Sequence, residues 1–192
     1  MSLALVDVVQ AVRAACHALG ARWYVFGAQA AILRGAVRHT EDVDFTIDLA
    51  GRATRDLVDA LATRGVALRV TDADDFIAAT QVLPLVHRAS GTPIDVVLAG
   101  SALEARFFDR AESITVDGVD IRVPCIEDLL VMKVLAARPK DLEDVAAIAA
   151  ANPDHDAAAV RETRREIEAA IEHDDLLPAY DAALVRARRA RR

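Results

Sequence analysis

The feature that most constrains the fold is a strand that ends at a glycine, followed after a short helix by a second strand that begins with two acids. Residues 23–26 are aromatic or β-branched, which predicts a strand. Gly27 follows directly and precedes a short helical run over 28–33. Asp42 and Asp44 open the next predicted strand. Because side chains alternate along a strand, both carboxylates face the same side, about 7 Å apart along the backbone.

Two carboxylates placed in this way can share a pair of Mg²⁺ ions, which lie about 3.5 to 4 Å apart in phosphoryl-transfer sites. Mg²⁺ keeps several waters, so few protein ligands are needed. A third acid, Asp95, lies in the otherwise apolar run 93–98, where an ionised group is costly unless it faces a cleft, a metal or a partner. The backbone N–H groups at Gly27 and Ala28 can bind phosphate oxygens, and glycine lets the ligand approach closely.

Simpler explanations exist for each of these residues. Asp42 and Asp44 could belong to a strand edge that faces water. They do not form an EF-hand, because the glycine and the distal glutamate of that loop are missing. Asp48 shares their strand face, and we expect it to be solvated at the strand end. Arg38 and Thr40 could contact phosphate, but ordering of the loop is the favoured role.

The rest of the pattern predicts an α+β core followed by helices. Helices are expected over 3–19, 52–64, from about 71, and from Ser101 to about 110. Further strands are expected over 66–70, 81–88, 93–98, 114–116 and 119–123, with hairpins at Ser90-Gly91-Thr92 and Asp117-Gly118. Everything after Ile126 reads as helix, broken at Pro139 and Pro153. We therefore expect a core over 1–125 and a helical region over 126–192.

Composition excludes several classes of protein. A chain of 192 residues that is 54% hydrophobic can bury a proper core, and its net charge of −7 argues against a surface that is basic all round. The two cysteines lie far apart, so neither a disulfide framework nor a structural zinc site is expected. No segment is apolar enough to span a membrane, and the start lacks the basic region of a signal peptide, so a cytoplasmic protein is expected. Walker A, G-x-G-x-x-G and G-x-S-x-G patterns are absent from the sequence.

The run Phe26-Gly27-Ala28, together with residues 38–45, resembles the signature of the DNA polymerase β-like nucleotidyltransferase superfamily. Asp95 stands in the place of the third carboxylate of that superfamily. The resemblance implies a mixed sheet flanked by helices. Ala28 departs from the pattern, because the family usually has glycine or serine there. A hydroxyl contact to phosphate would be lost, while the backbone N–H remains.

A second stretch is similar to the helical block of AbiEii/AbiGii-type nucleotidyltransferase toxins and their uncharacterised relatives. It covers residues 126–133 and 136–145. That likeness implies that Lys133, one of only two lysines in the chain, lies near the nucleotide phosphates. The alternative is that Lys133 is the solvated edge of an amphipathic helix. Pro139 and the acids that follow it suit the first turn of a new helix, so a structural role is expected for them.

These resemblances imply a nucleotidyl transfer from a nucleoside triphosphate to a hydroxyl group. Asp42 and Asp44 would hold two Mg²⁺ or Mn²⁺ ions, and Asp95 would hold the catalytic ion and help to deprotonate the acceptor. Acceptors could be tRNA or another RNA, a protein or a small molecule, and a toxin–antitoxin role with an antitoxin partner is implied. Two alternatives remain open: a non-catalytic nucleotide-binding or antitoxin protein with the same fold, and a structural protein in which the three carboxylates are dispersed.

Overall fold

The computed structural model describes residues 3–71, 73–171 and 176–190, and its contacts divide the chain into two compact units. The sheet unit comprises Met1–Gln29 and His39–Val123. The helical unit comprises Ala30–Arg38 and Pro124–Arg192. A boundary near residue 125 was expected from the sequence. The assignment of Ala30–Arg38 to the helical unit was not.

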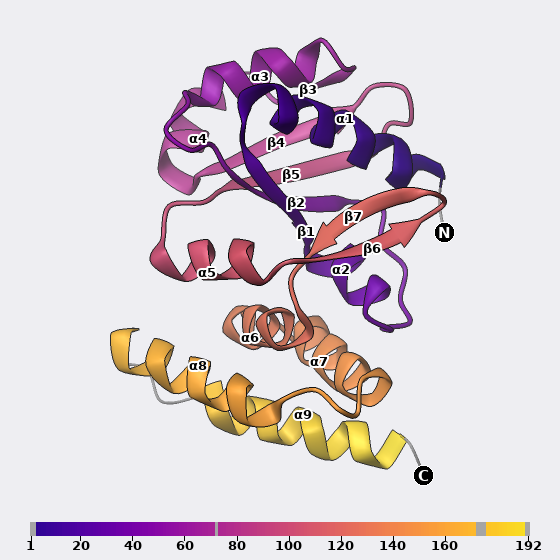
Figure 1. Ribbon diagram of the computed structural model, residues 1–192, viewed down its shortest axis with the longest axis vertical. Coiled ribbons are helices and arrows are strands. Elements are labelled where there is room, and N and C mark those ends of the chain that lie inside the picture. The colour runs from indigo at the N-terminus through magenta and orange to yellow at the C-terminus, as the bar shows by residue number, and fades with distance from the viewer. Residues whose placement is uncertain (1–2, 72, 172–175, 191–192) are drawn as a thin grey trace. The chain divides into compact units, whose positions relative to one another are not determined.

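A five-stranded mixed sheet forms the centre of the sheet unit, in the order β1-β2-β5-β4-β3 (Figure 1). β2 and β5 are parallel, whereas the pairs β1–β2, β4–β5 and β3–β4 are antiparallel. The strands are β1 Arg22–Phe26, β2 Val43–Asp48, β3 Val66–Leu68, β4 Val82–His87 and β5 Pro93–Leu98. Together with the flanking helices, this sheet confirms the expected α+β class.

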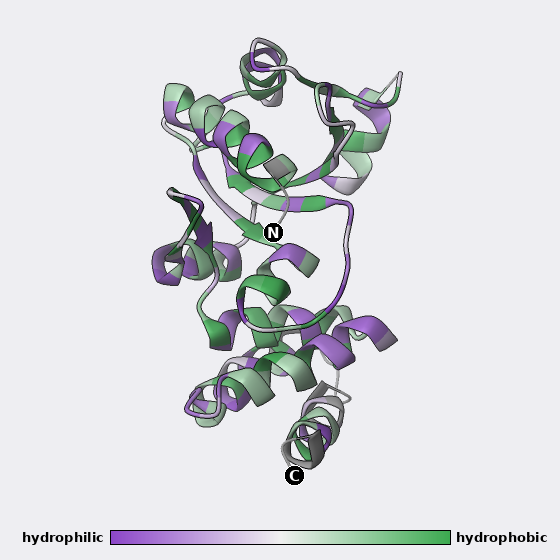
Figure 2. Ribbon diagram, turned by 90° about the vertical axis from the view of Figure 1, so that its right-hand side faces the viewer, coloured by the Kyte–Doolittle hydropathy of each residue, from purple (hydrophilic) through white to green (hydrophobic). Residues whose placement is uncertain are grey.

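The helices that accompany the sheet are α1 Leu3–Leu19, α3 Thr54–Ala62, α4 Ala73–Thr80 and α5 Ala102–Arg110, with α2 Gly27–Leu33 directly after β1. α1 and α3 pack against each other, and Val8, Val12 and Leu57 are fully buried. The helices carry both hydrophobic and hydrophilic residues (Figure 2), as expected when one face of a helix lies against a core and the other faces solvent. No helix in the described ranges combines the length and the apolar character that crossing a bilayer would need.

Alternation along β2 separates the core from the polar face of the sheet. Val43, Phe45 and Ile47 are at most 1% exposed, whereas Asp44 and Asp48 are half-buried on the opposite face. A shift of one residue in the register would bury the acids and expose the apolar side chains, which fixes the face to which the acids point.

Local signals in the sequence are confirmed in several turns and caps. Asp117 and Gly118 both have positive φ (48° and 80°), the conformation of a tight hairpin turn between β6 Glu112–Val116 and β7 Val119–Val123. β4 and β5 form the expected antiparallel hairpin. Ser101 accepts a hydrogen bond from the backbone N–H of Glu104, whose side chain accepts from the N–H of Ser101. This capping box starts α5 where the sequence predicted a helix.

The helical unit contains α6 Ile126–Ala136, α7 Pro139–Ala151, α8 Ala157–Ile171 and α9 Leu176–Ala190. Pro139 lies in the first turn of α7, as predicted. Several contacts join the segment Ala30–Arg38 to this unit, among them a hydrogen bond from Nη2 of Arg34 to the carbonyl of Pro124 at 2.7 Å. Asn152 donates from Nδ2 to the carbonyl of Arg34 at 2.7 Å, and Gly35 lies so close to Ala151 that an added Cβ would be 2.4 Å from the alanine Cβ.

Candidate active site

Asp44 and Asp95 are direct neighbours across the parallel pair of β2 and β5. Residues at matched positions on adjacent strands point to the same face, so the two carboxylates lie side by side on the polar face of the sheet. Asp42 was expected to open the strand, but β2 begins at Val43, so Asp42 lies in the loop just ahead of it and strand alternation does not fix the direction of its side chain. The register therefore brings together two of the three predicted carboxylates from strands about fifty residues apart in the sequence.

Gly27 lies directly against the carboxylate of Asp44. Its φ is +64°, and a Cβ added at this position would be 1.9 Å from Oδ2 of Asp44. Any side chain here would clash with the carboxylate and would also strain the backbone. The sequence assigned Gly27 to the close approach of a phosphate, and the structure adds that the glycine also makes room for Asp44.

The loop before β2 holds Asp42 by its side chain and by its backbone. The hydroxyl of Thr40 donates to Oδ1 of Asp42. Nε2 of Gln29, on α2, donates to the backbone carbonyl of Asp42 at 3.5 Å. These contacts give Thr40 the loop-ordering role that was favoured from the sequence.

Asp95 is paired with a cation that the sequence did not single out. Nη2 of Arg69 forms an ion pair with Oδ1 of Asp95, and about a third of each side chain is exposed (37% and 35%). Arg69 belongs to the run 66–70 that was predicted to be strand throughout, but β3 ends at Leu68. No local pattern marks Arg69, because its importance comes from the order of strands in the sheet.

The residues present fit a divalent-cation site in their chemistry and in part of their geometry. Asp44 and Asp95 offer oxygen ligands from adjacent strand positions, and Asp42 offers a third from the same stretch of chain. Hard cations such as Mg²⁺ and Mn²⁺ prefer such ligands. Among the side chains of the described residues, no three His, Cys, Asp or Glu are gathered closely enough to hold an ion. Thr40 and Arg69 instead engage Asp42 and Asp95.

Lys133 lies in the helical unit and is buried, with 5% of its side chain exposed. Its Nζ donates to Asp141 at 3.2 Å and to Asp144 at 2.7 Å. The alternative of a solvated helix edge is therefore wrong. The helix α6 is apolar on most sides, which removes the amphipathic pattern on which that alternative rested.

Two arginines complete the cluster around Lys133. Arg38 donates to Oδ2 of Asp144 at 2.8 Å, and Arg138 donates to Asp141 at 2.5 and 3.2 Å. Burial raises the pKa of Asp141, but hydrogen bonds from Arg138 and Lys133 outweigh burial and hold the pKa below its ordinary value. We call these five residues the buried ion cluster. The structural role that the sequence indicated for Asp141 and Asp144 is consistent with their place in it.

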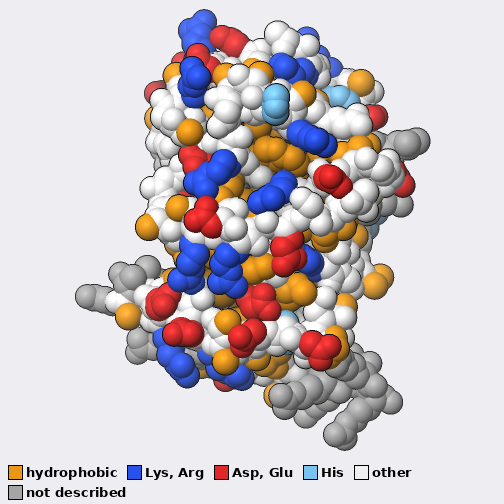
Figure 3. Space-filling model, viewed as in Figure 1, with side chains coloured by type: hydrophobic (Ala, Val, Ile, Leu, Met, Phe, Trp, Pro, Cys, Tyr) orange, Lys and Arg blue, Asp and Glu red, His pale blue; other side chains and the backbone are white. Residues whose placement is uncertain are grey.

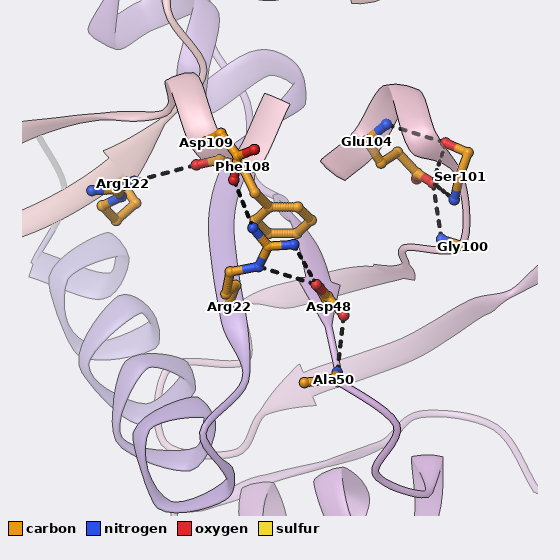
Figure 4. A network of polar contacts seen from close by, with 9 residues as sticks. All are labelled: Arg22, Asp48, Ala50, Gly100, Ser101, Glu104, Phe108, Asp109 and Arg122. Carbon is orange, nitrogen blue, oxygen red and sulfur yellow. Dashed lines mark hydrogen bonds and ion pairs between the residues drawn. The ribbon is translucent and has the colours of Figure 1, made fainter. Parts of the chain in front are cut away.

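Asp48, at the far end of β2, takes part in a separate network (Figure 4). Arg22 donates from Nη2 to Asp48 at 2.7 Å and from Nη1 to Asp109 at 2.9 Å, and its guanidinium lies 4.8 Å from the ring centre of Phe108. The N–H of Ala50 and the side chain of Arg22 lower the pKa of Asp48. We expected Asp48 to be solvated at the strand end. It is instead half-buried, and its ion pair with Arg22 connects β2 with β1.

Charge on the outer surface is mixed. Acidic and basic side chains are interspersed over the face shown in Figure 3, in keeping with the modest net negative charge. Among the described side chains on that face, acidic and basic groups alternate over short distances, unlike the basic patch by which a protein binds nucleic acid non-specifically.

Comparison with protein families identifies the chain. The sequence model of the family described as "Nucleotidyltransferase of unknown function (DUF6036)" matches residues 4–154, most of the sequence. The chain belongs to this nucleotidyltransferase family. The matched residues include Gly27, all three predicted carboxylates and the buried ion cluster. A search of curated proteins finds no match.

Solved structures support the nucleotidyltransferase fold independently. The solution structure of the antibiotic-resistance factor ANT(2'')-Ia aligns with a TM-score of 0.61 at 19% identity, covering 90% of this chain and 97% of that one. The crystal structure of ANT(2'')-Ia in complex with adenylyl-2''-tobramycin aligns with a TM-score of 0.59 at 16% identity, covering 88% and 99%. At such identities the likeness shows the fold alone.

Proposed function

We propose that this nucleotidyltransferase moves a nucleoside monophosphate from a nucleoside triphosphate to a hydroxyl acceptor, with Mg²⁺ or Mn²⁺ held by Asp42, Asp44 and Asp95. The observation that carries the proposal is the pairing of Asp44 with Asp95 on adjacent parallel strands, with Gly27 against the first of them. Acids at matched positions on the interior strands of a sheet repel each other and are costly unless a cation neutralises them.

Each residue has a defined task in this proposal. The backbone N–H groups of Gly27 and Ala28 bind phosphate oxygens of the triphosphate. Asp95 accepts the proton of the attacking hydroxyl, and Asp42 and Asp44 would hold the divalent ions. The bound ions supply charge neutralisation of the phosphates and lower the pKa of the acceptor hydroxyl. Such a reaction needs positioning and electrostatics rather than a covalent enzyme intermediate.

The resemblance to AbiEii/AbiGii-type toxins supports a finer proposal, in which the acceptor is a tRNA or a protein, Lys133 offsets the charge of the leaving pyrophosphate and an antitoxin restrains the activity in the cytoplasm. The buried position of Lys133 requires that Asp141 and Asp144 release its ammonium when the nucleotide binds. The adenylyl-tobramycin complex of ANT(2'')-Ia supports a small-molecule hydroxyl as a further acceptor to test.

A transfer assay tests the proposal. The protein is incubated with each α-³²P-labelled nucleoside triphosphate, Mg²⁺ or Mn²⁺, and in separate reactions total tRNA, total protein or an aminoglycoside. We expect label to appear in one acceptor class, to depend on the divalent ion and to disappear in Asp44→Asn and Asp95→Asn. The proposal is wrong if the carboxylate variants transfer label as well as the wild type does.

A further inference from the structure

The neighbouring carboxylates Asp44 and Asp95 are followed across the sheet by a basic residue, Arg69, which pairs with Asp95. Pro84 on β4 is the direct partner of Asp95 on β5. The backbone N–H of Arg69, just after β3, donates to the carbonyl of Pro84 at 3.0 Å. Arg69 just after β3, Pro84 on β4, Asp95 on β5 and Asp44 on β2 therefore follow one another across the sheet.

This placement explains how Arg69 reaches Asp95. Neighbouring strands lie about 4.8 Å apart, so two strand spacings separate the backbones of the two residues by roughly 10 Å. Pro84, between them, is buried and carries only a short ring. A long arginine side chain can extend over this ring, and its guanidinium meets the carboxylate of Asp95 in an ion pair.

The pair is weak enough to be exchanged. Both side chains are about one-third exposed, and ion pairs between solvent-accessible groups contribute roughly 0.2 to 1 kcal/mol. At equal distance a divalent ion attracts a carboxylate more strongly than a singly charged guanidinium does, because it carries twice the charge. The guanidinium also has a second favourable partner in a triphosphate, because its planar fork matches phosphate oxygens as well as carboxylates.

We propose that Arg69 is a displaceable counter-ion of the metal site. It neutralises Asp95 while the site lacks nucleotide, disfavours entry of a free divalent ion, and exchanges Asp95 for a phosphate oxygen when the metal–triphosphate complex binds. Arg69 thus binds substrate directly and makes the binding of metal and nucleotide cooperative. This inference rests on the function proposed above.

Binding measurements that need no catalytic turnover test this role. Affinity for Mn²⁺ alone is measured by the electron paramagnetic resonance of free Mn²⁺, and affinity for Mn²⁺-loaded inorganic triphosphate by calorimetry. We expect Arg69→Gln to bind Mn²⁺ alone up to about fivefold more tightly than the wild type, the factor that corresponds to a surface ion pair of about 1 kcal/mol. The same variant should bind the Mn²⁺–triphosphate complex several-fold more weakly.

Two variants serve as controls. Arg55→Gln removes an arginine of α3 whose side chain is 89% exposed and lies 3.9 Å from Asp59, and it should change neither affinity. Arg69→Lys keeps the charge, so it should bind the triphosphate complex more tightly than Arg69→Gln does. A variant that had failed to fold would show no such recovery. Melting temperatures of all variants confirm that the fold is intact.

The outcomes separate this inference from the proposed function. If Asp44→Asn and Asp95→Asn abolish Mn²⁺ binding but Arg69→Gln binds Mn²⁺ and triphosphate like the wild type, the role of Arg69 is wrong and the metal site stands. If the two carboxylate variants keep wild-type Mn²⁺ affinity, the metal site itself is wrong, and the role of Arg69 falls with it.

Discussion

The molecule combines carboxylates with cations in two places, in opposite ways. On the polar face of the sheet, Asp95 forms an ion pair with Arg69, and both side chains remain accessible to solvent. In the helical unit, Asp141 and Asp144 are almost fully buried and share Lys133. An exposed pair is cheap to open, whereas opening a buried one leaves a charge without solvent or partner. The comparison teaches that the first arrangement suits exchange of ligands and the second suits holding helices together.

The largest effect should come from removing Lys133, the most deeply buried cation of the buried ion cluster. Lys133→Met keeps the volume of the side chain but leaves two buried carboxylates with less compensation, so the free energy of unfolding should fall by about 3 to 5 kcal/mol. Urea denaturation measures this loss. Arg38 and Arg138 stay in place and should hold the effect near the lower end of that range.

Lys140→Met is the matched control, because Lys140 is exposed at the start of α7. It should leave the urea midpoint almost unchanged. Equal midpoints for the two variants would contradict a structural role for the cluster. A stable Lys133→Met variant with weakened triphosphate binding would instead favour direct contact with nucleotide.

Asp44→Asn should affect the rate of transfer and spare the stability, which is the opposite of the effect expected for Lys133→Met. If Asp44 holds a metal ion as proposed, its replacement should lower nucleotidyl transfer by about 10²- to 10³-fold, the range seen when one preorganised electrostatic group is removed from an active site. Stability should be kept or slightly increased, because repulsion from Asp95 is relieved. Initial rates of transfer and thermal melting measure the two quantities. A loss of stability without a loss of rate would assign Asp44 to the fold instead of the reaction.

Gly27→Ala tests whether the close contact with Asp44 has a function. Forcing a non-glycine residue into positive φ costs about 1 to 2 kcal/mol, and the new Cβ would also push the Asp44 carboxylate away. Gly20→Ala is the matched control, since Gly20 has a similar φ of +67° but open space around it. Both variants should melt at lower temperature, and only Gly27→Ala should lose Mn²⁺ affinity. Equal Mn²⁺ affinities would show that Asp44 can move without consequence.

The smallest effect concerns pH. The pKa of Asp141 is lowered in the folded state, so its ionised form stabilises the protein above the ordinary carboxyl value of 3.8, and this stabilisation is lost as the pH falls below that value. Asp141→Asn should therefore flatten the acid limb of a plot of unfolding free energy against pH. Asp59→Asn, on the exposed face of α3, should leave that limb as in the wild type. Parallel acid limbs for all three proteins would exclude a depressed pKa of Asp141.

Much of the site could be predicted because its signals are local. Gly27 follows a strand and opens a helix, and Asp44 lies on the polar face of β2 because apolar side chains occupy the alternate positions of that strand. Asp95 attracted attention as an acid in an apolar strand. Arg69 and Gln29 could not be predicted in this way, because each contacts its acid from another element of the fold.

The sequence alone determined the elements, the hairpin at Asp117-Gly118, the capped start of α5 and the nucleotidyltransferase signature, because backbone preferences and hydrophobic periodicity act over a few residues. Only the tertiary structure decided that β2 pairs with β5, that Ala30–Arg38 joins the helical unit, and which cation meets which carboxylate. Strand register between distant segments depends on how whole faces pack, and ion pairs depend on that register. The short run from Gly27 to Asp44 therefore contains two of the three proposed metal ligands, whereas the placement of Asp95 beside Asp44 comes from the fold as a whole.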